Sequence, residues 1–225
     1  MGEKKNLDST LMNFIEPAQA SQDYFIKKEI SKLVDFELKG FEFFFEIIDL
    51  DENTKEELRS ILSDAKKLPA ALGGFHGAYP GGLFDHILLV VNYANFICSS
   101  LTKDTSWLKK LILTAICHDF GKIQYYGFKL DLNDRKIKIN VNDADDVRKE
   151  LTSKFKISGK DTHVEHGIAI IKKYLTKHTQ LFDEEMYQAI VFHHGSWSKY
   201  QPQKLNELAS LLHVADMIAS QILKI

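Results

Sequence analysis

The 225-residue sequence has few residues of the kinds that dictate a special architecture. Its four prolines and twelve glycines exclude a collagen-like repeat and a long Pro/Gly linker. Its two cysteines, Cys98 and Cys117, lie in apolar runs typical of helices, where a thiol packs as a small hydrophobe. We therefore expect no disulfide scaffold, and we expect the protein to work in a reducing, cytoplasmic setting.

An excess of one charge and a long hydrophobic run are also missing. The sequence has 29 Lys and Arg against 31 Asp and Glu, a net charge of -2, so no global field draws the protein to nucleic acid. Apolar runs such as Ile87–Val91 fall far short of the roughly 20 residues that span a bilayer. Met1–Asp8 lacks the apolar core of a signal peptide. We expect no membrane partner, and any polyanion must be recognised locally.

The sequence does contain hydrophobic periodicity of the helical kind, with 44% hydrophobic residues. We expect helices near residues 23–38, 53–65, 83–100, 108–117, 145–154, 163–177, 183–194 and 203–223. Phe41–Ile48 could be a buried helix or a short strand. In Lys129–Val141, apolar and polar residues alternate after turn residues, which predicts a small β-hairpin. The fold class is all-α with a minor β insertion.

One segment rich in Gly and Pro, Leu68–Gly82, is the only plausible internal boundary. It predicts an N-terminal helical extension over residues 1–68 and a second domain over residues 69–225.

All nine histidines lie after residue 75, and six of them fall, together with two aspartates, on expected helices or at their ends. These residues are His86, His118, Asp119, His163, His166, His193, His194 and Asp216. Imidazole together with carboxylate favours Mn, Fe, Co, Ni or Zn, and the lack of an accompanying cysteine argues against a structural zinc knuckle. His118 and Asp119 lie at an expected helix end, with Gly121 placed to stop the helix. There both side chains could meet one metal, or Asp119 could bridge two.

Five short segments carry these residues in order: Gly81–His86, His118–Lys122, His163–Gly167, Ala189–Gly195 and Leu212–Asp216. In order and spacing they resemble the signature segments of the HD-domain metal-dependent phosphohydrolases, over about Pro69–Ser220. The resemblance implies an HD-domain helical bundle.

The resemblance also implies a dinuclear centre, with Mn, Fe, Co or Ni favoured over Zn or Mg. In it, His86, His118, Asp119 and Asp216 would bind one of the two divalent metal ions, and His163 and His193 the second, with Asp119 bridging. His166 stays an alternative to His163. The resemblance suggests catalytic roles for Asp119, Lys122 and His194. Lys122 would either contact a phosphate or be only a solvated cation. His194 would either contact the substrate or donate a hydrogen bond to a metal ligand. His76 is either a loop residue or a substrate-facing one.

Two divalent ions would activate a metal-bound hydroxide for phosphoester hydrolysis. The sequences of Gly81–His86 and His193–Gly195 are most similar to those of HD-domain 3'-5' exoribonucleases and of HD domains attached to relaxases. However, residues 1–68 show no OB-fold, and the loop after His193–Gly195 differs from that of the exoribonucleases. The substrate could therefore be a nucleotide, a cyclic dinucleotide or a short oligonucleotide. Trp197 and Tyr200 could stack a base or anchor their loop.

Two other functional classes stay open. The domain could be a non-catalytic nucleotide-binding sensor that signals through its N-terminal helices. It could also be a di-iron oxygenase, since some HD-fold proteins with a similar metal site oxidise organic substrates.

Overall fold

The computed structural model describes residues 37–73, 75–101, 104–159, 162–176, 182–201 and 204–223. These residues form mostly helices, as predicted for the fold class, and the only sheet among them has two strands. The α-helices are α3 (Phe41–Ile48), α4 (Glu52–Ala65), α5 (Gly82–Ser99), α6 (Thr105–Cys117), α7 (Gly121–Lys129), α8 (Val141–Lys154), α9 (Thr162–Ile170), α10 (Glu184–Phe192) and α11 (Glu207–Met217). The short elements are strands β1 (Lys156–Ile157) and β2 (Tyr200–Gln201), the π-helical turns η1 (Ile171–Leu175) and η3 (Ile218–Leu223), and the 3₁₀ turn η2 (Gly195–Trp197).

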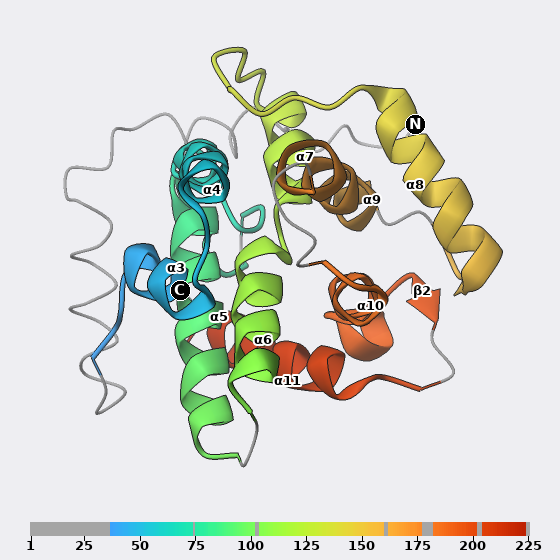
Figure 1. Cartoon of the computed structure of the whole chain (residues 1–225). Helices are drawn as coiled ribbons and strands as arrows, with labels where there is room; N and C mark the ends of the chain where they lie inside the picture. Colours follow the sequence, from blue (N-terminus) through green and yellow to red (C-terminus); the bar gives the residue numbers. More distant parts are fainter. Residues whose placement is uncertain are drawn as a thin grey trace.

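Helices α5 and α6 lie side by side through the middle of the molecule (Figure 1). Helix α5 is buried on every side from Gly82 to Ala94, and α6 is buried from Leu111 to Cys117. Helix α5 is long and apolar enough to cross a membrane, but 78% of its apolar window is buried inside the fold. Burial on all sides is the pattern of a core helix.

The ambiguous segment Phe41–Ile48 is a helix. Its buried side chains, Phe41, Phe44, Phe45 and Ile48, recur at spacings of three and four, which places them on one face. The Phe41 ring meets the ring of Phe84 on α5 edge-on, with centroids 5.0 Å apart. This face therefore packs into the central core.

The described part of the N-terminal region shares that core. The Asn92 side chain of α5 accepts a hydrogen bond from the Lys39 N–H at 2.8 Å and donates one to its carbonyl at 3.0 Å. Helix α4 begins after Asp51, whose carboxylate accepts from the N–H of Thr54. Asp51 is thus the N-cap, and the helix begins one residue before the start expected at residue 53. The helix expected over residues 23–38 lies mostly outside the described residues, and the division at residue 69 stays a prediction.

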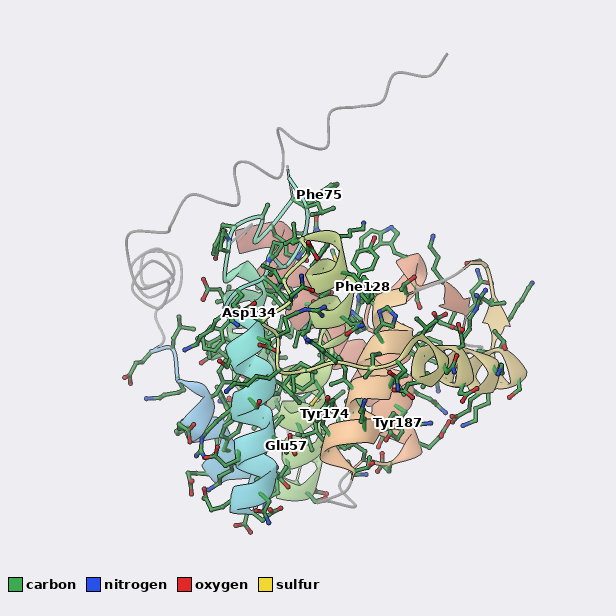
Figure 2. All side chains as sticks on the ribbon, turned by 90° about the horizontal axis from the view of Figure 1, so that it is seen from above. Glu57, Phe75, Phe128, Asp134, Tyr174 and Tyr187 are labelled. Carbon is green, nitrogen blue, oxygen red and sulfur yellow. The ribbon has the colours of Figure 1, made fainter. Side chains whose placement is uncertain are left out.

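The prediction of a hairpin over residues 129–141 is wrong in its position, because the two strands that form lie later in the chain. Its isoleucines are buried, as the alternation indicates, but no strand forms there. The N–H of Ile137 donates to the Asp64 carboxylate at 2.8 Å, and the N–H of Lys138 donates to the Tyr174 hydroxyl at 3.2 Å. Tyr174 is labelled near the middle of Figure 2. Side chains of other helices thus take the role that a partner strand would have.

The two strands that do form are distant in sequence. Strand β1 pairs antiparallel with β2, with Lys156 opposite Gln201 and Ile157 opposite Tyr200. Tyr200 is fully buried, and its hydroxyl donates to Glu165 on α9 at 2.6 Å. Tyr200 therefore anchors its loop to the core and is not exposed for stacking on a base.

Gly121 does not end a helix as expected; it begins helix α7. Its φ angle is not positive, so a left-handed conformation is not the reason for glycine here. A Cβ atom at this position would lie 1.5 Å from the carbonyl oxygen of His163 on α9. Glycine is needed because α7 and α9 touch backbone to backbone, and this contact brings His163 toward Asp119.

We predict that Gly121→Ala destabilises the protein by about 3 kcal/mol, because the two helices must separate to admit a methyl group. Gly40→Ala is the matched control, since a Cβ there meets nothing within 4 Å. Urea unfolding of both variants measures the difference. Equal stabilities of the two variants would contradict the backbone contact.

Candidate metal centre

The centre begins where α6 gives way to α7. His118 caps the end of α6, Asp119 follows it, and both side chains are buried. The Nδ1 atom of His118 lies 2.7 Å from the carbonyl oxygen of Ala115, which holds the ring in one orientation. Its Nε2 atom then lies 3.3 Å from Asp119 Oδ2. Two adjacent residues therefore face one site, as expected for a helix end.

A first cluster of possible ligands surrounds Asp119 Oδ2. His86, from the middle of the core on α5, places its Nε2 atom 3.3 Å from this oxygen and 3.4 Å from His118 Nε2. Asp216 on α11 approaches the same His86 nitrogen at 3.2 Å. The three helices α5, α6 and α11 thus bring together the four residues expected to bind one metal.

A second cluster lies on the other side of Asp119. His193 caps α10, its Nδ1 atom lies 2.6 Å from the carbonyl oxygen of Ile190, and its Nε2 atom lies 3.7 Å from Asp119 Oδ1. His163 and His194 complete the cluster, with their Nε2 atoms 3.0 Å apart. One possible ligand atom from each of these residues and from Asp119 lies within 4.8 Å of the others.

The structure brings His163 into this cluster, and His166 belongs to neither cluster among the described residues. His194 is closer to the centre than the sequence suggested. Besides His163, it faces Asp216, whose Oδ2 atom lies 3.5 Å from His194 Nδ1. His194 is therefore placed as a possible ligand as well as a substrate contact, which its adjacency to His193 concealed in the sequence.

Lys122 is not a solvated cation. It is only 8% exposed on the first turn of α7, and its Nζ atom lies 2.7 Å from Asp119 Oδ2. His213 also contacts the centre, because its Nδ1 atom lies 2.7 Å from the carbonyl oxygen of His193. Its place three residues before Asp216 on α11 is the sequence signal for this contact.

The electrostatics of the centre keep the carboxylates ionised. Burial alone would raise the pKa of Asp119, but Lys122 and the imidazoles of His118 and His86 outweigh it and hold this pKa well below its usual value. Burial likewise opposes ionisation of Asp216, whose pKa His194 and His86 lower.

The histidines respond differently to burial. Burial, together with His194 and His118, lowers the pKa of His193 far below its usual value. Burial also lowers the pKa of His194. His86 is the exception, because contacts with Asp119 and Asp216 outweigh its burial and raise its pKa. The lowered pKa values of His193 and His194 favour neutral imidazoles beside ionised carboxylates, which are the protonation states that metal binding needs.

These residues fit a bound cation. With a proton on Nδ1 for the backbone carbonyl, the Nε2 atoms of His118 and His193 are lone-pair acceptors that face the Asp119 carboxylate. Asp119 Oδ1 and His193 Nε2 are buried without a hydrogen-bond partner among the described residues. Acceptors aimed at one another repel unless a proton or a metal ion lies between them. A metal between the clusters would satisfy these atoms.

The comparison with known families agrees with this geometry. The HD domain matches residues 83–220, which is more than half of the chain. The chain belongs to the HD-domain family. This family lies within a superfamily of metal-dependent phosphohydrolases, and the clustered His and Asp residues could hold its divalent metal. No curated protein and no solved structure matches the chain.

We predict that Asp119→Asn lowers the affinity for Mn, Fe, Co or Ni by more than about tenfold, because it removes the negative charge that both clusters share. Asp64→Asn is the control, since Asp64 is equally buried but lies against Ile137, away from the clusters. Elemental analysis after reloading with each metal measures the loss. Wild-type protein that holds less than about half an equivalent of any transition metal would contradict the assignment.

Proposed function

We propose that the protein is a metal-dependent phosphodiesterase or nuclease that hydrolyses a nucleotide, a cyclic dinucleotide or a short oligonucleotide. The observation that carries the proposal is the position of Asp119. Its Oδ2 atom faces His86 and His118 and its Oδ1 atom faces His193, so one carboxylate joins two clusters of imidazoles. A carboxylate between two ligand sets is the arrangement of a two-metal hydrolase.

In this proposal the first cluster, His86, His118 and Asp216, holds one divalent ion, and His163 and His193 hold the second, with Asp119 contributing to both. Two such ions, when bound, supply Lewis acidity that activates water and stabilises charge on the phosphate. The chain orients its ligands by backbone contacts, because His118 and His193 are each fixed through Nδ1.

Lys122 and His194 are the residues that we assign to the substrate. Lys122 lies beside Asp119 in a buried position, where its charge can neutralise a phosphate oxygen next to the centre. His194 is less buried than His193, with 28% of its side chain exposed, so it lies on the side of the centre that solvent reaches. There it can donate a hydrogen bond to the phosphate or to the leaving oxygen.

Trp197 offers a second contact for such a substrate. It lies three residues after His194 in η2 and is 64% exposed, although burial of an indole is strongly favourable. Its ring lies 6.3 Å from the ring of His213, which itself contacts the His193 carbonyl. An exposed indole next to the centre supports recognition of a nucleobase by stacking.

We predict that Trp197→Ala raises KM about tenfold for a substrate with a base, from the stacking energy of about 1–3 kcal/mol per base, and leaves KM for bis-(p-nitrophenyl) phosphate less affected. Phe128→Ala is the control, because Phe128 is 69% exposed but lies in the last turn of α7. Its label in Figure 2 marks that position. Equal changes of KM in the two variants would contradict base stacking by Trp197.

We also predict that short substrates are cut in preference to long duplexes. A duplex needs many phosphate contacts, and a chain with a net charge of -2 has no broad excess of basic residues to make them. Turnover of a mononucleotide, a cyclic dinucleotide, a short single strand and a long duplex, each at low and moderate salt, provides the test. Preferential cutting of the duplex with a steep salt dependence would reject the substrate class, and no turnover of any of them would reject hydrolysis.

A further inference from the structure

One ligand of the proposed centre lacks the support that its counterparts have. His118 and His193 each use Nδ1 to contact the carbonyl oxygen three residues earlier in their own helix. The Nδ1 atom of His86 is buried and has no hydrogen-bond partner among the described residues. Metal-binding histidines almost always donate this second N–H to a neighbour, which fixes the tautomer and the ring orientation. His86 therefore needs a partner from outside its helix.

His76 is placed to be that partner. Its ring centroid lies 4.9 Å from that of His86, with the two rings inclined by 41°. Its Nε2 atom is also buried without a hydrogen-bond partner in the described part of the chain. A buried polar atom without a partner destabilises the fold, so two such atoms on neighbouring rings point to one shared partner.

The loop that carries His76 is held firmly against α5. The N–H of Ala70 donates to the Gly77 carbonyl at 2.8 Å, and the N–H of Gly81 donates to the Leu68 carbonyl at 3.1 Å. Gly77 has a φ angle of +58°, and a Cβ atom on Gly82 would lie 2.0 Å from its carbonyl oxygen. The loop therefore approaches the start of α5 as closely as the backbone allows, which fixes the position of His76 over His86.

From this geometry we infer that His76 is a positioning residue, whose Nε2 atom accepts the Nδ1 proton of His86 through one bridging water molecule, since the two atoms make no direct hydrogen bond. The donor and acceptor match. When His86 binds a metal through Nε2, its proton must be on Nδ1, whereas a neutral imidazole of His76 with its proton on Nδ1 offers Nε2 as an acceptor. The inference rests on the proposed function, because it takes His86 to be a ligand.

The test compares His76→Ala and His76→Gln with wild-type protein, with Phe75→Ala as the control. Phe75 is in the same loop, but it is 72% exposed and its label lies at the edge of the molecule in Figure 2. Metal affinity is measured by chelator competition, and the visible spectrum is recorded after loading with Co²⁺. We expect His76→Ala to weaken binding by about 10- to 100-fold and to change the Co²⁺ spectrum. The amide oxygen of His76→Gln, which can accept the same proton, should restore part of both, and Phe75→Ala should change neither.

The possible failures are distinguishable. If wild-type protein binds no metal, the proposed function and this inference both fail. If wild-type protein binds metal and His76→Ala binds it equally well, only the role of His76 fails, and an unchanged affinity with a raised KM would make His76 a substrate contact instead.

Wild-type protein loaded with Zn²⁺ gives a measurement that does not depend on any variant folding. The Nδ1 proton of His86 should then appear as a slowly exchanging signal in its nitrogen-15 spectrum, and its absence would overturn the inference.

Discussion

The structure depends on keeping one carboxylate, that of Asp119, ionised in the middle of the protein. An isolated buried charge is costly enough that the group would normally take up a proton instead. Here Lys122 and the surrounding imidazoles supply the compensation, and the pKa of Asp119 falls although burial opposes it. Every helix that reaches the centre therefore has to deliver a polar group to the same point. This requirement explains why α5, buried on all sides, carries a histidine among its apolar residues.

Rigid helix ends meet this requirement more readily than flexible loops. His118 and His193 each cap a helix and contact a carbonyl oxygen of the last turn, so the backbone itself sets the direction of the ring. The backbone contact at Gly121 then fixes the distance between α7 and α9 and hence the place of His163. The packing of the helices therefore determines the positions of the possible metal ligands. A change in helix spacing would move a ligand even where no ligand is mutated.

The sequence predicted the parts of this arrangement that depend on local pattern. The helices follow from periodicity, and the order of the segments around His86, His118, His163 and His193 predicted which side chains meet. It could not predict contacts between distant backbones. Nothing local shows that Gly121 is required by α9, or that Asp64 would replace a partner strand for Ile137. The sequence also could not decide the separate roles of the adjacent residues His193 and His194. The way α10 ends places His194 near Asp216, and this is visible only in the structure.

The two clusters differ in their access to water, and this difference assigns them different tasks. His86 and His118 are fully buried, whereas His163 and His194 are partly exposed. A metal held by the buried set would exchange slowly, because its ligands are acceptors that solvent does not reach. A metal held by the exposed set would be the one that a phosphate can approach. Under the proposed function, a substrate would therefore approach the centre from the side of His163 and His194, and the buried cluster would set the charge against which its phosphate binds.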